Sequence, residues 1–130
     1  MAVSKNCIAV SEMVFIGFHA NPTDVVREID SLVDVYDDVL KQWKIENVVI
    51  MGDFNAACSY VKDKDWKNIR LATDKRFWWL ISDCQDTTVQ GTRCAYDRYV
   101  KYQVCLCFHR LTNDNYHGKK CNRDSICSYL

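Results

Sequence analysis

An aspartate and an asparagine follow a short apolar run near the middle of the chain. Val48 to Met51 are four apolar residues, and Gly52 comes directly after them. Such a run, bounded by a glycine, predicts a buried strand whose carboxyl end presents Asp53 and Asn55. The two side chains offer one anionic and one neutral oxygen. These are ligands that Mg²⁺ and Ca²⁺ prefer and that zinc does not.

The same residues also have a simpler interpretation. Glycine, aspartate and asparagine after a strand are ordinary turn residues, because the polar side chains hydrogen-bond the local backbone. On the pattern alone, a turn is the commoner role for residues 52–55. A metal site therefore needs support from other parts of the chain.

A histidine ends the strand that is predicted to come before this one. Residues 8–18 predict a buried strand that ends at His19. Asn21 can cap a following helix, Pro22 suits its first position, and Asp24 falls in its first turn. The apolar positions of that helix alternate in spacing between four and three residues, which places them on one face over about 20 residues. They are Val25, Ile29, Leu32, Tyr36, Val39 and Trp43.

Strand, helix and strand in succession form a βαβ unit, whose two strands are parallel if they share a sheet. Parallel strands present their carboxyl ends at the same side, where open α/β sheets place ligands. We therefore expect His19 and Asp53 at one rim of the sheet. An imidazole, which exchanges protons near neutral pH, would then lie beside a candidate metal or phosphate site. The alternative for His19 is a histidine buried at the end of a strand.

The later segments predict shorter elements. Residues 61–75 are charged and predict a loop, with one short helical turn around Trp66 and Ile69. Residues 77–81 are rich in aromatic side chains and predict a strand, and residues 94–100 predict another.

A polar loop over residues 83–93 connects these last two strands. Asp86, Thr87 and Thr88 could present oxygens to calcium there. Aspartate and threonine also favour turns for backbone reasons alone, so a plain turn is the commoner alternative.

The composition is that of one domain with enough apolar residues for a core. The 130 residues are 48% hydrophobic and 26% charged, with a single proline, and this argues against disorder. No apolar run approaches the roughly 20 residues of a membrane span. Seventeen basic and seventeen acidic residues cancel, so no global field attracts nucleic acid. This argues against tight non-specific DNA binding and not against a nuclease.

The cysteines favour an oxidising compartment, because eight in 130 residues is a high count for a cytosolic protein. Residues 1–10, however, lack the basic and apolar regions of a signal peptide. Four of the cysteines lie in residues 103–130, which show little periodicity. The cysteines and histidines there do not have the paired spacing of zinc ligands. They are Cys105, Cys107, His109, His117, Cys121 and Cys127.

Residues 51–61 read Met-Gly-Asp-Phe-Asn-Ala-Ala-Cys-Ser-Tyr-Val, and this run resembles the signature of the deoxyribonuclease I family of secreted endonucleases. Further stretches are similar to the family in the same order. They are residues 18–22, 29–36, 66–71, 86–88 and 94–98. The resemblance extends from about residue 9 to residue 100.

The resemblance implies an α/β fold of the endonuclease/exonuclease/phosphatase type. That fold is a β-sandwich of mixed sheets with flanking helices, and this chain would carry part of it in residues 1–100. Residues 101–130 do not resemble the family, and we interpret them as a divergent cysteine-rich tail. The resemblance also implies secretion. We expect no membrane partner.

Individual site residues follow from the same resemblance. It implies that His19 is one of two catalytic histidines and that Asp97 orients the second. It also implies that Asp53 and Asn55 belong to the Mg²⁺ and scissile-phosphate site, with Tyr96 near the phosphate.

Two structural features are implied as well. Asp86 and Thr88 match a structural Ca²⁺ loop of the family, and Cys58 with Cys94 match its disulfide. A bridge closing that loop would stabilise the fold by about 3 to 4 kcal/mol on the chain-entropy estimate. The resemblance assigns no partner to the other six cysteines, which are Cys7, Cys84, Cys105, Cys107, Cys121 and Cys127.

Several family residues have no counterpart in this sequence. The missing amino-terminal half carries a metal-binding glutamate, the glutamate that pairs with the first histidine, and phosphate-binding arginines. The missing carboxyl-terminal strand carries the second histidine in a Ser-Asp-His motif. We do not expect His109 or His117 to reach Asp97 in its place.

These departures limit the expected activity, because losing one member of a cooperating catalytic set can cost as much as losing all of it. We expect a divalent-metal-dependent endonuclease that hydrolyses DNA phosphodiester bonds, with weak or absent activity in this chain. The alternative is a non-catalytic fragment that acts by binding DNA, actin or another protein.

Overall fold

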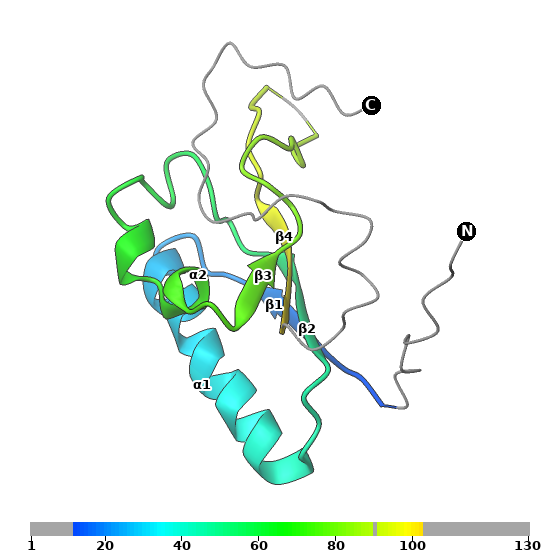
Figure 1. Ribbon diagram of the computed structural model, residues 1–130. Helices are drawn as coiled ribbons and strands as arrows, with labels where there is room; N and C mark the ends of the chain where they lie inside the picture. The colour runs from blue at the N-terminus through cyan, green and yellow to red at the C-terminus, as the bar shows by residue number, and fades with distance from the viewer. Residues whose placement is uncertain (1–11, 90, 103–130) are drawn as a thin grey trace, which may run out of the picture.

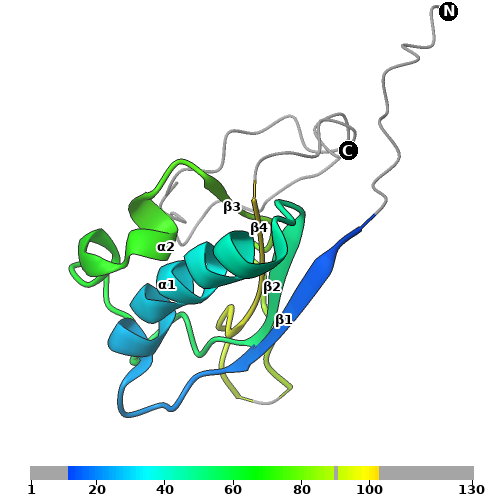
Figure 2. The same cartoon turned by 90° about the horizontal axis from the view of Figure 1, so that it is seen from below.

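A computed structural model describes residues 12–89 and 91–102, which form a mixed sheet covered by helices on one face (Figure 1). In chain order the elements are β1 (Val14–His19), α1 (Val25–Trp43), β2 (Val48–Asp53), the 3₁₀ turn η1 (Trp66–Asn68), α2 (Arg70–Thr73), β3 (Phe77–Trp79) and β4 (Asp97–Tyr102). The strands lie in the order β1-β2-β4-β3. Figure 2 shows α1 and α2 on the same side of this sheet. The predicted α/β class with a mixed sheet is confirmed.

The predicted βαβ unit is present. β1 and β2 are parallel and in register from Val14 opposite Val48 to His19 opposite Asp53. β4 runs antiparallel to both of its neighbours, β2 and β3. The part of the chain that the structure describes contains this one sheet and no second sheet of the expected sandwich.

The core lies between α1 and the sheet. Five residues of α1 are buried there: Val25, Ile29, Leu32, Val33 and Tyr36. The helix spans 19 residues, as its apolar spacing predicts. The predicted apolar face is wrong at one position, since Trp43 is 59% exposed. Trp43 is the last residue of α1, and no residue of that last turn is buried against the sheet.

The predicted start of α1 is also wrong. The helix begins at Val25, and its N-cap is Asp24 rather than Asn21. The Asn21 carboxamide oxygen instead accepts hydrogen bonds from the backbone N–H of Thr23 at 3.0 Å and from its hydroxyl at 2.9 Å. Asparagine often closes such a turn on its own backbone, and here the turn holds Pro22 outside the helix.

Two strands differ from their predicted bounds. β3 ends at Trp79 instead of residue 81, and only one further backbone bond follows, from Leu80 N–H to the Tyr99 carbonyl. β4 begins at Asp97 instead of residue 94, and the N–H of Tyr96, the residue directly before it, donates to a side chain and not to a neighbouring strand. β4 then continues to Tyr102, two residues past the predicted end of the strand at residue 100.

Gly52 lies inside β2 and not in a turn after it. A Cβ atom at this position would lie 2.0 Å from the Phe18 carbonyl oxygen in β1, and the backbone φ is +140°. Both features exclude side chains other than hydrogen. The glycine therefore allows β1 and β2 to stay paired up to His19 and Asp53, and Asp53 is the last residue of the strand.

A buried arginine connects β4 to two loops. Arg98 is 1% exposed. Its guanidinium donates to the carbonyls of Ile81 at 2.8 Å and Ala56 at 2.7 Å, and to the Asp83 carboxylate at 2.6 Å. It also lies over the rings of two tryptophans of the core, Trp66 and Trp79. Burial lowers the pKa of Arg98, and the nearby Asp83 carboxylate opposes that effect. Arg98 thus fixes the loop after β2 against the loop after β3.

Replacing this arginine is expected to destabilise the fold strongly. In Arg98→Met the stem is kept, but two buried carbonyls and Asp83 lose their partner, which should cost about 2 to 4 kcal/mol. Urea denaturation measures this change, with the exposed Arg27→Met as a charge-matched control. A loss below about 1 kcal/mol for Arg98→Met would show that these bonds do not hold the loops.

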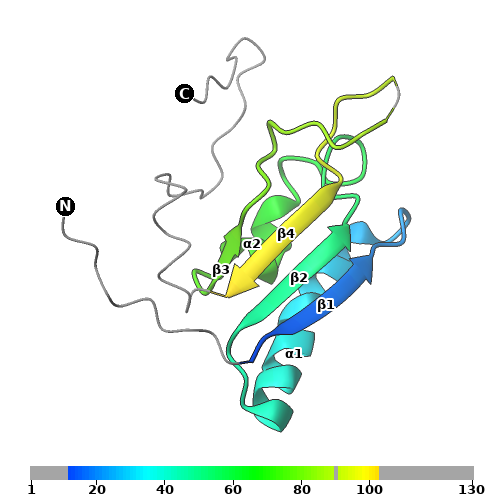
Figure 3. The same cartoon turned by 90° about the vertical axis from the view of Figure 1, so that its right-hand side faces the viewer.

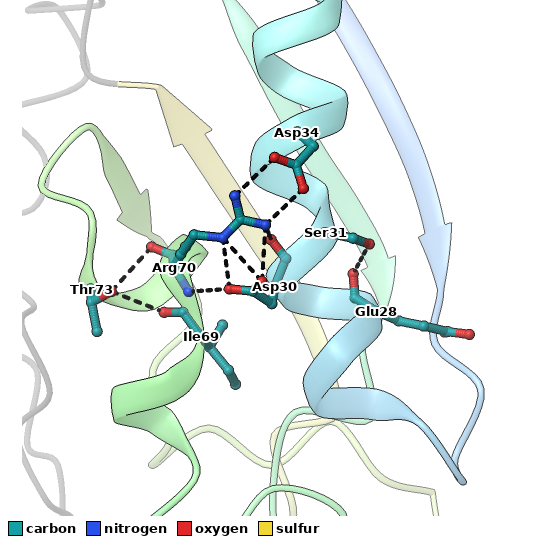
Figure 4. Close-up of polar contacts among 7 residues, drawn as sticks. All are labelled: Glu28, Asp30, Ser31, Asp34, Ile69, Arg70 and Thr73. Atoms are coloured by element: carbon teal, nitrogen blue, oxygen red, sulfur yellow. Dashed lines mark hydrogen bonds and ion pairs between the residues drawn. The ribbon is translucent and has the colours of Figure 1, made fainter.

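Ion pairs join α2 to the outer face of α1 (Figure 4). The Arg70 side chain donates to both carboxylate oxygens of Asp30 and to both of Asp34, at 2.7 to 3.1 Å. The backbone N–H of Arg70, at the first position of α2, also donates to Asp30 at 2.7 Å. These hydrogen bonds from Arg70 lower the pKa of Asp30 and of Asp34.

The Arg70 pairs should make stability depend on pH and salt. A carboxylate whose pKa is lowered by folding contributes stability above its unfolded pKa of about 3.9, and this is lost as the pH falls through the folded value. We expect Arg70→Met to be less stable than the unsubstituted chain at pH 7, with a difference that shrinks near pH 2 and in 1 M NaCl. Urea unfolding under these conditions tests it. Arg70→Lys should recover only part of the loss, because lysine lacks the planar fork. If Arg70→Met lost the same stability at pH 7 and at pH 2, the pairs of Arg70 with Asp30 and Asp34 would not be the cause.

Candidate functional site

Three polar residues stand side by side across the sheet at one rim. His19 ends β1, Asp53 ends β2 and Asp97 begins β4, and they are direct partners in the strand register. Figure 3 shows these three strand ends at the same end of the sheet, with the helices behind. The His19 Nε2 atom lies 3.7 Å from the Asp53 Oδ2 atom, and their side chains are 74% and 41% exposed. The predicted meeting of His19 and Asp53 is confirmed.

Asn55 is held beside this row by its own backbone and side chain. Its φ is +48°, in the left-handed region that asparagine tolerates. Its backbone N–H donates to Asp53 Oδ1 at 3.0 Å, and its side-chain amide donates to the Ala20 carbonyl at 3.0 Å. Asn55 is 6% exposed. Because the side-chain NH₂ group donates to the Ala20 carbonyl, the carboxamide oxygen is the atom that a ligand would bind.

Tyr96 lies directly before β4 and is hydrogen-bonded to Phe54, which lies between the candidate ligands Asp53 and Asn55. Its carbonyl accepts a hydrogen bond from the Phe54 N–H at 2.9 Å, and its ring lies 5.5 Å from the ring of Tyr60. The disulfide between Cys58 and Cys94 joins the same two segments. The structure therefore contains the disulfide that the family resemblance implies, and it ties the loop after β2 to the residues before β4.

Oxygens of Asp86, Thr88 and Thr92 lie close together in the loop before β4. The Asp86 Oδ1 atom accepts the Thr88 N–H at 2.9 Å and contacts the Thr88 hydroxyl at 2.6 Å. The Thr88 hydroxyl also contacts the Thr92 carbonyl. Hydrogen bonds from the Thr88 hydroxyl and N–H lower the pKa of Asp86. A carboxylate, a hydroxyl and a carbonyl are the oxygen types that calcium sites use.

Thr87 has a different role from its two neighbours. Its hydroxyl oxygen accepts the N–H groups of Tyr96 and Asp97, each at 3.0 Å, and donates to the Cys94 carbonyl at 3.3 Å. Two accepted bonds use both lone pairs of the oxygen. The Thr87 hydroxyl oxygen therefore has no lone pair left for calcium. Its sequence position next to two plausible ligands gave no sign of this role.

The donors at the rim suit a hard divalent cation in type. Asp53 and Asp97 are carboxylates on paired residues, and Asn55 adds a neutral amide oxygen. Among residues 12–89 and 91–102, no group of three or more histidine, cysteine, aspartate or glutamate side chains is close enough to hold a metal. The rim thus offers part of the oxygen set that a divalent cation would need. His109 and His117, the other two histidines of the chain, lie outside the described residues.

Within the same described ranges, no helix is both long and apolar enough to cross a membrane. The predictions for the tail at 101–130 concern residues that are almost all outside the described part, so its structure stays a prediction.

Comparison with known proteins identifies relatives over most of the chain. Residues 3–103 match the endonuclease/exonuclease/phosphatase family. Deoxyribonuclease gamma of Mus musculus is 55% identical over 106 residues, which are 81% of this chain and 33% of that protein. Deoxyribonuclease gamma of Homo sapiens is 60% identical over 93 residues, or 71% of this chain and 30% of that protein. Deoxyribonuclease-1 of Equus caballus is 54% identical over 91 residues, or 70% of this chain and 32% of that protein.

The chain spans about a third of the length of these curated relatives. The match nevertheless covers every element that builds the rim, from β1 to β4. On this identity and coverage, the chain belongs to the deoxyribonuclease I branch of the endonuclease/exonuclease/phosphatase family.

Proposed function

We propose that this chain carries part of a DNA endonuclease site and cleaves DNA phosphodiester bonds weakly, with a divalent cation. The observation that carries the proposal is the row of His19, Asp53 and Asp97 across three strands at one rim. Relatives named deoxyribonucleases are more than half identical over the segment that builds this row. DNA is accordingly the proposed substrate.

His19 is proposed to move a proton in this reaction. Phosphodiester hydrolysis needs a base to activate water and an acid to protonate the leaving 3′ oxygen. The imidazole of His19 is 74% exposed, so water and a bound phosphodiester can reach it. The Asp53 Oδ2 atom lies 3.7 Å from Nε2, so the imidazole stands at the rim beside the proposed metal ligand. One histidine can serve one of the two proton transfers.

Asp53 and Asn55 are proposed to hold Mg²⁺, because carboxylate and amide oxygens are its preferred ligands. When bound, the cation supplies positive charge that offsets the charge developing on the phosphate oxygens. Asn55 keeps its carboxamide oxygen available because its amide nitrogen donates to Ala20. Tyr96 would lie along the bound phosphate, since its carbonyl accepts a hydrogen bond from Phe54, the residue between Asp53 and Asn55. Asp97 would orient a second histidine.

We expect weak activity because the described residues hold only some of the catalytic groups that the reaction needs. The described residues supply one imidazole and too few clustered ligands for a complete metal shell. Removing one member of a cooperating set can cost nearly the whole rate enhancement. We therefore expect nicking far slower than that of an intact family site.

Asp86 and Thr88 are proposed to bind Ca²⁺ with the Thr92 carbonyl, because these three oxygens converge in one loop. The site lies on the segment leading to Tyr96 and Asp97, so its role is structural. The Cys58–Cys94 disulfide supports a secreted protein, since such bonds persist in oxidising compartments.

The expected result is slow conversion of supercoiled plasmid to nicked circles by the purified chain with Mg²⁺ and Ca²⁺, and none with EDTA. Asp53→Asn should lower the rate at least about 100-fold, and His19→Ala by about 100- to 10,000-fold, because each removes a group acting at the reacting phosphate. Asp38→Asn on α1, away from the rim, makes the same change of charge and should leave the rate unchanged.

No nicking above the His19→Ala background would reject the catalytic proposal. The chain would then act through binding of DNA, actin or another protein.

Calcium is expected to raise the thermal unfolding temperature of the chain by a few degrees, because a ligand that binds only the folded state stabilises it. Asp86→Asn should abolish the shift. Asp65→Asn is the matched control, since Asp65 also accepts a backbone N–H within its own loop, at 3.0 Å from Lys62, without a calcium ligand set. The lowered pKa of Asp86 means that the shift should persist down to about pH 4 and disappear at lower pH. An equal calcium shift in Asp86→Asn would exclude this site.

A further inference from the structure

The start of β4 depends on a side chain for its backbone hydrogen bonds. The N–H groups of Tyr96 and Asp97 both donate to the Thr87 hydroxyl oxygen at 3.0 Å. The residue opposite Asp97 in β2 is Asp53, and the Asp53 carbonyl accepts the Ala20 N–H of the segment after β1 at 2.9 Å. For these two N–H groups at the rim, one threonine hydroxyl therefore takes the place of a backbone acceptor.

The Thr87 hydroxyl is itself held in one orientation. It donates to the Cys94 carbonyl at 3.3 Å, and the Thr87 N–H donates to the same carbonyl at 3.0 Å. With its proton directed at Cys94, the oxygen presents both lone pairs to the two amides. The bonds of Thr87 thus reach three of the four residues from Cys94 to Asp97.

The same bonds connect Thr87 to the rest of the rim. The Tyr96 carbonyl accepts the Phe54 N–H, and Phe54 lies between Asp53 and Asn55. Asn55 in turn bonds to Ala20, the residue after His19. These hydrogen bonds, together with the peptide bond between Phe54 and Asn55, link Thr87 to Ala20, the residue after β1.

We propose that Thr87 is a positioning residue, whose hydroxyl fixes the backbone of Tyr96 and Asp97 and so sets where these two side chains stand at the rim. Its consequence for catalysis rests on the proposed endonuclease function, whereas its effect on the backbone does not. Thr87 touches no reacting group in this role, and acts through the residues that it holds.

Amide hydrogen exchange, followed by NMR in the ¹⁵N-labelled full chain, tests the positioning directly. In the unsubstituted protein the Tyr96 and Asp97 amides should be protected. Thr87→Val keeps the side-chain shape and removes the acceptor, and should accelerate exchange at these two amides roughly 3- to 10-fold. Thr87→Ser keeps the oxygen and should restore protection to within twofold.

Thr73→Val is the matched control. Thr73 is an exposed threonine, and its hydroxyl also hydrogen-bonds a backbone carbonyl, that of Ile69 at 3.2 Å, away from the rim. This variant should leave exchange at Tyr96 and Asp97 unchanged. Unprotected amides in the unsubstituted chain, an unchanged rate in Thr87→Val, or a failure of Thr87→Ser to restore protection would each overturn the proposal. If Thr87→Val does not fold, the unsubstituted chain and Thr87→Ser still decide.

Plasmid nicking by the same proteins separates this inference from the proposed function. We expect Thr87→Val to lower kcat on the order of tenfold with little change in KM, because misplaced groups act in the transition state, and Thr87→Ser to recover kcat. Absence of nicking in the unsubstituted chain, together with the expected exchange pattern, would reject the endonuclease and support the positioning role. If Thr87→Val nicks plasmid as fast as the unsubstituted chain, the proposed effect of Thr87 on catalysis is wrong.

Discussion

The close approach of β1 to β2 at Gly52 determines how the remaining parts of the site meet. A Cβ atom there would lie 2.0 Å from the Phe18 carbonyl, so any side chain would force the two strands apart one residue before His19 and Asp53. Their separation of 3.7 Å between Nε2 and Oδ2 depends on that pairing, as does the bond between Ala20 and Asp53. A residue with no side chain thus controls the distance between two that can carry chemistry.

Around that pairing, the rim is held mostly by polar groups of loops. Arg98 ties the loops after β2 and β3 to β4, Thr87 holds the backbone before β4, and the disulfide joins Cys58 to Cys94. The hydrophobic core between α1 and the sheet lies behind these contacts. Apolar burial therefore stabilises the fold, while directional bonds determine where the site residues stand.

The elements with regular apolar periodicity could be predicted from the sequence. The βαβ unit, the parallel pairing and the meeting of His19 with Asp53 follow from strand and helix patterns and from the handedness of the crossover. The start of α1 could not, because Asn21 has two competing ways to bind backbone N–H groups and the structure uses the turn. The roles of Thr87 and Arg98 could not be predicted from the sequence either. Both depend on partners 7 to 42 residues away, which no local pattern specifies.

The strand order has a consequence for how the chain folds. β1, α1 and β2 are consecutive and can pair early, whereas β4 pairs with β2 across the long segment between Asp53 and Asp97. Contacts between residues distant in sequence form late, because closing the intervening loop costs entropy first. The Cys58–Cys94 bond spans 36 residues of the same segment, so forming it early would shorten the search that brings β4 to β2. We expect the site to be completed last in folding, after β1, α1 and β2 have packed together.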